Sequence, residues 1–115
     1  MRRFITPRAA GRKYRNLPTE ADGIKFDSKK EAGRYLQLKL CVAAGQVRAL
    51  RLQVPYKLAV NGKHVCTYRA DFVYEGKFGA RWIEVVEDVK GVRTREYLIK
   101  KKLMAAIYGI EIRET

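Results

Sequence analysis

Two stretches of the chain alternate apolar and polar residues with the two-residue period of a β-strand. Leucine, valine or tyrosine occupies every even position of residues 50–60, and a second alternating stretch covers residues 66–74. The tripeptide Asn61-Gly62-Lys63 between them has the composition of a tight hairpin loop. The pattern therefore predicts an antiparallel hairpin with a three-residue loop.

The apolar faces of these two strands determine their register. A slip of one residue would set the apolar face of one strand against the polar face of the other. With a three-residue loop, the predicted pairs are Leu52 with Phe72, Tyr56 with Tyr68 and Gln53 with Asp71. The register thus makes Gln53 the cross-strand neighbour of Asp71.

A third strand is predicted over residues 81–90, after a turn at residues 75–79. Its odd positions are largely apolar, whereas Asp88 and Lys90 occupy even positions. Because successive strand residues point to opposite faces, Asp88 and Lys90 are expected on the same side of the sheet.

Two helices are predicted from their cap residues. The first begins near Ser28, because Glu31 follows it with capping-box spacing, and it ends at Gly45. The second begins after Thr94, a favourable N-cap residue, and ends at Gly109.

A short apolar stretch, residues 110–113, predicts a last strand that pairs in parallel, because a helical crossover precedes it. The expected fold is an α/β domain over residues 21–115, with the order α-β-β-β-α-β and a mixed sheet flanked by helices. Residues 1–20 are rich in cations and show no period. They are expected to form a basic arm that is flexible in the free protein and orders along phosphates on DNA.

The net charge is +13, from 25 lysines and arginines against 12 acids in 115 residues. This excess favours a polyanionic partner, and nucleic acid is the first candidate. A membrane partner is not expected, because no apolar run approaches the roughly 20 residues that span a bilayer. The first residues lack the apolar stretch of a signal peptide, which predicts a cytoplasmic location. In that reducing compartment, Cys41 and Cys66 are expected to be free thiols.

The acidic residues are unevenly distributed. None occurs between Ala32 and Ala70, a stretch with 7 lysines and arginines, and Asp71 follows directly. Acids retained in a protein that attracts phosphate either face solvent or hold a cation. A spacing of 16 residues separates Asp71 from Asp88, enough for a turn and a return strand that bring the carboxylates together.

Asp71 and Asp88 are therefore candidate ligands of Mg²⁺ or Mn²⁺, which prefer hard oxygen donors. Lys90 would orient or activate an attacking water and steady a phosphate. Glu31 would complete the metal site directly or through water. Gln53 is either a further member of this site or an ordinary polar residue of a strand edge.

The same residues have structural interpretations. Asp71 and Asp88 could form salt bridges with Arg69 or Lys90, although two aspartates and a lysine on one strand face are costly unless a cation joins them. Glu31 could serve only in the capping box.

Three segments resemble the PD-(D/E)XK nuclease superfamily, and above all a small phage-encoded branch of it. They are residues 26–32, 68–72 and 87–91. The resemblance covers the chain from about Phe26 onwards and implies a restriction-endonuclease-like core. It assigns catalysis to Glu31 on the first helix, Asp71 on the second strand and Asp88-Val89-Lys90 on the third. Ala70 stands where the motif has proline.

The resemblance implies a Mg²⁺- or Mn²⁺-dependent endonuclease acting on DNA, similar to Holliday-junction resolvases and transposon end-cutting endonucleases. Because the chain is short for an added recognition domain, branched DNA in phage recombination or replication is the expected substrate. Paired symmetric cuts would require a homodimer. The alternatives are a non-catalytic nucleic-acid-binding module, or a nuclease acting on RNA or on a specific duplex sequence. The expected DNA contacts are Arg12, Lys13, Arg15, Arg34, Arg69, Lys100 and Lys101.

Overall fold

The computed structural model describes residues 18–115. The chain divides into two compact units, Met1–Leu36 and Gln37–Thr115, and each is described by itself. The predicted basic arm falls almost entirely outside the described residues, and with it Arg12, Lys13 and Arg15.

The first unit contains a small hairpin that the sequence pattern did not predict. Strands β1 (Thr19–Ala21) and β2 (Ile24–Phe26) pair antiparallel around Asp22 and Gly23, whose φ angles are 52° and 74°. Positive φ at both central residues is the conformation of a type I′ turn. Strands of three residues are too short to show a period, which is why this hairpin was missed.

Helix α1 (Lys29–Ala43) begins in the first unit and extends into the second. The Ser28 side chain accepts a hydrogen bond from the Glu31 backbone N–H at 3.1 Å, so the predicted helix start is confirmed. The ring of Tyr35 lies 5.1 Å from that of Phe26, and its hydroxyl donates to Asp22 Oδ2 at 3.0 Å. Tyr35 thereby ties the small hairpin to the helix.

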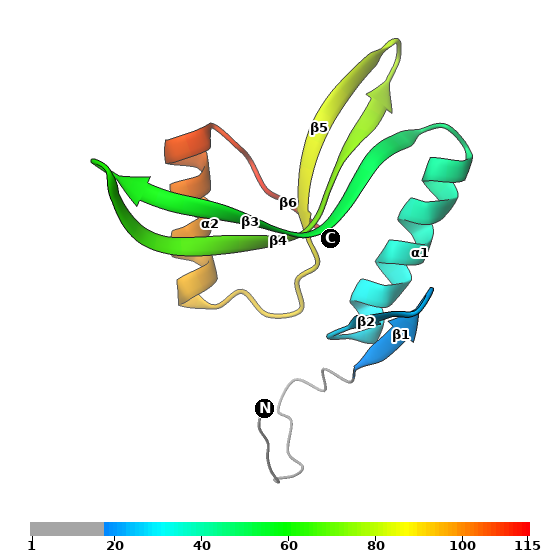
Figure 1. Ribbon diagram of the computed structural model, residues 1–115, viewed down its shortest axis with the longest axis horizontal. Coiled ribbons are helices and arrows are strands. Elements are labelled where there is room, and N and C mark those ends of the chain that lie inside the picture. The colour runs from blue at the N-terminus through cyan, green and yellow to red at the C-terminus, as the bar shows by residue number, and fades with distance from the viewer. Residues whose placement is uncertain (1–17) are drawn as a thin grey trace, which may run out of the picture. The chain divides into compact units, whose positions relative to one another are not determined.

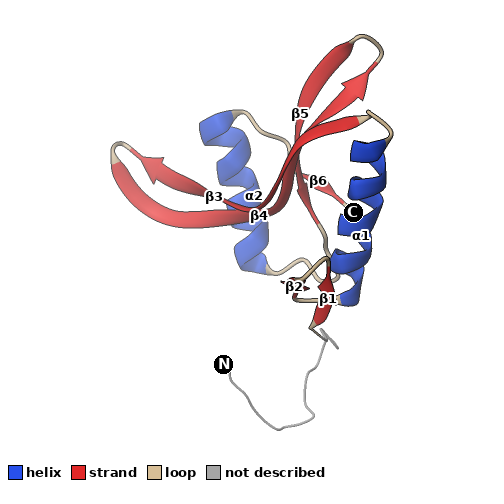
Figure 2. Cartoon of the chain, turned by 45° about the vertical axis from the view of Figure 1, so that its right-hand side comes forward, coloured by secondary structure: helices blue, strands red, loops and turns tan. Residues whose placement is uncertain are grey.

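The second unit is built on a mixed sheet of four strands in the order β3-β4-β5-β6. Strands β3 (Val47–Val60), β4 (Lys63–Phe78) and β5 (Arg81–Asp88) pair antiparallel, whereas β6 (Arg113–Glu114) pairs in parallel with β5 (Figure 2). The α/β class, the mixed sheet and the parallel last strand were all predicted. Helix α2 (Arg95–Tyr108) packs on β3 and β4, beside the part of these long curved strands that lies near their turn (Figure 1).

The β3–β4 turn is tighter than predicted, but the predicted register is correct. Asn61 and Gly62 form a two-residue turn with φ angles of 52° and 78°, so that Val60 pairs with Lys63. A register shift between Leu58 and Ala59 then leaves one extra residue on β4. The shift restores the alignment of a three-residue loop, so the predicted pairs Leu52 with Phe72 and Tyr56 with Tyr68 both form.

The predicted turn at residues 75–79 is wrong. Strand β4 continues through these positions, and the chain reverses only between Phe78 and Arg81. Gly76 was read as a turn residue, but it makes room for a side chain, since a Cβ there would lie 3.2 Å from the ring of Phe78. The last strand also starts later than predicted, because Ile110 N–H bonds to Met104 O and closes helix α2.

The caps of α2 are as predicted. Thr94 accepts from the Tyr97 backbone N–H at 3.1 Å, and Gly109 adopts a left-handed conformation with φ of 69°. Cys41 and Cys66 are free thiols, as predicted, but they are only half-buried, whereas the apolar pattern around them predicted buried side chains. Within residues 18–115, no helix is both long enough and apolar enough to cross a membrane.

The core of the second unit joins the hairpin to α2. Its buried members are Leu58, Tyr68, Ala70, Val73, Val86, Tyr97, Met104 and Ile112. On β4 these are even-numbered residues up to Ala70 but odd-numbered Val73 beyond it. Because Phe72 and Tyr74 are buried as well, both faces of the strand are covered beyond Asp71.

Candidate active site

The structure brings Asp71 and Asp88 together, as the sequence predicted. Strand β4 pairs with β5 through Phe72 and Glu87, and the same register continued by one residue sets Asp71 opposite Asp88. The backbone N–H of Val89 donates to Asp71 Oδ2 at 2.9 Å, which ties the first aspartate to the end of β5. Asp88 is buried and Asp71 is half-buried. The two carboxylates thus lie close together at the end of β5.

Gln53 is the predicted neighbour of Asp71. Its side-chain amide donates to Asp71 Oδ1 at 3.2 Å, so one oxygen of Asp71 accepts from β3 and the other from the backbone directly after β5. Gln53 has φ of 52° within β3, a left-handed conformation that costs a non-glycine residue roughly 1–2 kcal/mol. Strain of this kind often marks a functional position.

Lys90 lies on the same side as Asp88, which was also predicted. Its Nζ is 2.8 Å from Asp88 Oδ2 and 3.9 Å from the centre of the Tyr97 ring. Backbone hydrogen bonds of 3.0 Å from Lys90 N to Thr115 O and from Thr115 N to Asp88 O extend the β5–β6 pairing to this position. The ammonium group is therefore held between a carboxylate and an aromatic face, on an ordered backbone.

Tyr97 was not predicted as part of the site. Its hydroxyl donates to Glu114 Oε2 at 2.7 Å, and Glu114 also binds Lys101 at 2.9 Å and Arg93 at 2.8 Å. The hydrogen bond from Tyr97, together with these two cations, lowers the pKa of Glu114 to about 2. Burial, and then the bond to this carboxylate, raises the pKa of Tyr97. The Tyr97 ring, which lies against Lys90, is thus held in place at its hydroxyl end by Glu114.

Tyr68 is the second residue that sequence reasoning missed. Its hydroxyl is buried beside Asp88. Burial raises the pKa of Tyr68, and the next cause is the negative charge of Asp88. Tyr68 therefore adds a buried hydroxyl to the surroundings of Asp88.

Glu31 belongs to the first unit, so its place relative to the two aspartates stays a prediction. The residue is buried in the first turn of α1. Glu87, which follows the opposite phase to Asp88 on β5, is also buried. It accepts from the hydroxyls of Tyr74 and Thr115, an arrangement that indicates a structural role.

The predicted DNA contacts differ in their surroundings. Arg69 is exposed on β4, whereas Arg34 and Lys100 are half-buried. Lys101 is bound by Glu114, so part of its charge stabilises the packing of α2.

Within the described part of the chain, no group of three or more histidine, cysteine, aspartate or glutamate side chains is arranged to hold a metal ion. The donor set that the structure assembles here is the pair Asp71 and Asp88. Mg²⁺ is commonly bound by one or two carboxylates together with waters and substrate phosphates.

Comparisons with curated proteins and with solved structures gave no match. A family model described as "Protein of unknown function (DUF1064)" matches residues 11–115. This description names no activity, so the resemblance to the PD-(D/E)XK nucleases stays a prediction. Because the match covers the whole of the described structure, the chain belongs to the DUF1064 family.

Proposed function

We propose that this protein is a metal-dependent endonuclease that hydrolyses phosphodiester bonds in DNA. The observation that carries the proposal is the meeting of Asp71 and Asp88, with Lys90 Nζ 2.8 Å from Asp88 Oδ2. A carboxylate pair beside a fixed lysine supplies the groups that phosphodiester hydrolysis requires. The resemblance of Asp71 and Asp88-Val89-Lys90 to the PD-(D/E)XK motif supports the same activity.

The residues of the site fit Mg²⁺ or Mn²⁺. Asp71 and Asp88 would hold the cation, with Glu31 as a further candidate ligand. The bond that each Asp71 oxygen accepts fixes the carboxylate and leaves lone pairs for a cation. The buried Tyr68 hydroxyl beside Asp88 adds a further oxygen to the surroundings of the site. When bound, such a cation would neutralise phosphate charge and make a coordinated water more acidic.

The protein's own groups have distinct tasks in this proposal. Gln53 and the Val89 N–H hold Asp71 in one orientation, so little reorganisation is needed when a substrate enters. Lys90 Nζ lies between Asp88 and the Tyr97 ring. From there its ammonium group can donate to a phosphate oxygen or orient the attacking water.

Branched DNA is the substrate that we propose, because the resemblance includes junction-cutting enzymes and the short chain favours recognition of shape over sequence. A second candidate function is a non-catalytic nucleic-acid-binding module. The net charge of +13 and exposed cations such as Arg69 favour it. The two functions differ in whether Lys90 affects a chemical step.

The test is Lys90→Ala, compared with Lys102→Ala, which removes an exposed lysine of α2. Four-way-junction, linear and single-stranded DNA are incubated with saturating protein and Mg²⁺ or Mn²⁺, and single-turnover rates are measured. We expect Lys90→Ala to slow cleavage by roughly 100-fold or more with little loss of DNA affinity, since the lysine acts in the transition state. Lys102→Ala should cleave at nearly the wild-type rate.

Thermal unfolding of both variants controls for the loss of a partner by the buried Asp88. Wild-type protein that binds these substrates but leaves them uncut with either metal would support the binding module. A folded Lys90→Ala variant that cleaves at the wild-type rate would refute the proposed site.

A further inference from the structure

The β3–β4 hairpin has one face in the core and one face open to solvent. Even-numbered side chains such as Leu58 and Tyr68 pack with α2, whereas the odd-numbered residues of this part of β3 are exposed. We call the open side the outer face. It comprises Gln53, Pro55, Lys57, Ala59, His64, Thr67 and Arg69.

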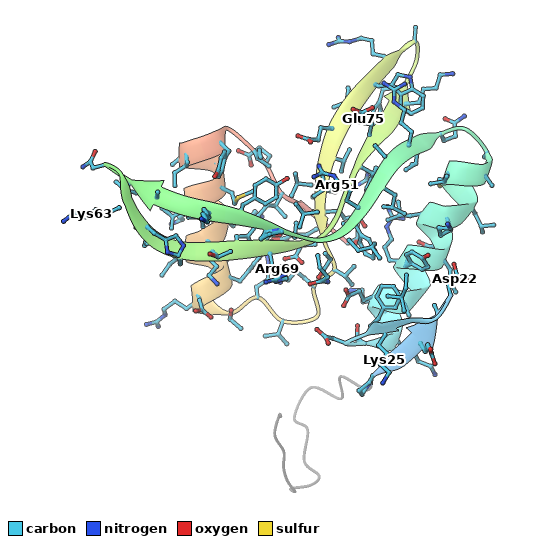
Figure 3. All side chains as sticks on the ribbon, viewed as in Figure 1. Asp22, Lys25, Arg51, Lys63, Arg69 and Glu75 are labelled. Atoms are coloured by element: carbon cyan, nitrogen blue, oxygen red, sulfur yellow. The ribbon has the colours of Figure 1, made fainter. Side chains whose placement is uncertain are left out.

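The outer face begins at the candidate site and carries a cation in each of the next two cross-strand rows. Gln53 bonds to Asp71 in the first row; Arg69 then pairs with Pro55, and Lys57 with Thr67. Figure 3 shows Arg69 on β4 near the strongest bend of the strand and Lys63 at the hairpin tip.

No acidic residue occurs from position 53 to position 70. Among residues 18–115, moreover, neither Lys57 nor Arg69 forms an ion pair. Both residues are exposed. The positive charges of Lys57 and Arg69 are therefore not neutralised by ion pairs within residues 18–115.

The spacing of these rows suits a nucleic-acid backbone. Alternate residues of a strand lie roughly 6.6 Å apart. This is about twice the 3.4 Å rise per phosphate of one DNA strand. Cations in successive rows, here on neighbouring strands, can therefore contact nearby phosphates of a duplex that runs along the hairpin.

We propose that the outer face of the β3–β4 hairpin holds the phosphate backbone of duplex DNA and leads it to the Asp71 and Asp88 pair. Cleavage at the Asp71 and Asp88 pair rests on the proposed nuclease function. Binding of DNA to the outer face requires no chemical step. A protein partner is less well suited, because the apolar residues of this part of the hairpin, Pro55, Ala59 and the exposed Val65, are few and interspersed with cations.

The experiment compares two double variants that remove the same charge. Lys57→Gln/Arg69→Gln alters the outer face, and Lys102→Gln/Arg81→Gln removes two exposed cations elsewhere in the second unit. Binding to a fluorescently labelled 20-base-pair duplex is measured at several salt concentrations in EDTA. The slope of log affinity against log salt should fall by about 2 for the outer-face variant, because each lost phosphate contact contributes about 0.9. It should change by less than about 1 for the control pair.

Equal changes of slope in the two double variants, with both proteins folded, would overturn the proposal. The result is separable from that of the cleavage assay, because binding is measured without metal. If the outer-face variant alone loses contacts while the wild type cuts no substrate, the surface stands and the nuclease function fails. If the wild type cuts DNA and the two slopes match, the nuclease function stands and this surface fails.

Discussion

Gln53 combines backbone strain with a contact to a candidate catalytic carboxylate. Its φ of 52° places it in the left-handed region, and its amide bonds to Asp71 at 3.2 Å. A glycine would adopt this conformation without strain, but it would lack the amide that bonds to Asp71.

Replacing Gln53 by glycine and by alanine separates strain from contact. Both variants lose the amide, but only alanine keeps the strained backbone. Gln53→Gly should therefore be more stable than Gln53→Ala by about 1 kcal/mol in urea unfolding. Under the proposed function, both should slow cleavage by a similar factor, since both leave Asp71 Oδ1 without this donor. Equal stability, or a more stable alanine variant, would show that the conformation is not strained.

At the residue scale, the sequence predicted those members of the candidate site whose positions follow from the two-residue alternation of a strand. Asp71, Asp88, Lys90 and Gln53 could be placed because alternation and register decide which side chains are neighbours. Tyr68 and Tyr97 could not be placed in this way. The contacts of these two tyrosines depend on how β4 and α2 pack together. No short stretch of sequence encodes that packing.

At the scale of elements, Glu114 joins α2 to the short strand β6. It accepts from Tyr97 and Lys101 of the helix and pairs with Arg93 before it. Because β6 has only two residues, these side-chain bonds contribute much of what positions it. Through Tyr97 they also support the ring on which Lys90 rests.

The low pKa of Glu114 predicts how this connection responds to acid. Its folded value is about 2 against an ordinary 4.5, so its contribution to stability is complete above about 4.5 and is lost as the pH falls towards 2. Glu114→Gln should be less stable than the wild type at pH 7, and the gap should narrow between pH 4.5 and pH 2. Urea unfolding at pH 7, 4 and 2.5 measures the gap. A gap that stays constant over this range would contradict the assigned ion pairs.

The elements were predicted where caps and alternation agree. Both helix starts, three strands and the parallel last strand follow from Ser28, Thr94 and the period-two stretches. The errors occur where one residue type serves two purposes. Gly76 was read as a turn residue, but it makes room for the ring of Phe78. Asn61-Gly62 forms a shorter loop than predicted, and the bulge on β4 cancels the resulting change of register.

At the scale of the whole molecule, charge is the dominant property. The excess of 13 positive charges predicts DNA binding that weakens steeply with salt, because bound phosphates release counterions. Six of the 25 cations lie in residues 1–15: Arg2, Arg3, Arg8, Arg12, Lys13 and Arg15. This segment precedes every element that supplies a candidate catalytic residue.

Deletion of residues 1–15 should therefore weaken binding and spare the chemical step. The salt slope should fall by about 0.9 for each phosphate contact that the segment makes. At saturating protein, single-turnover cleavage should continue near the wild-type rate, because Asp71, Asp88 and Lys90 keep their contacts. A full-length variant with the six cations replaced by glutamine provides the control. If charge alone matters, it should match the deletion in affinity and in slope. Complete loss of cleavage in the deletion, with the glutamine variant still active, would instead assign residues 1–15 to the active site.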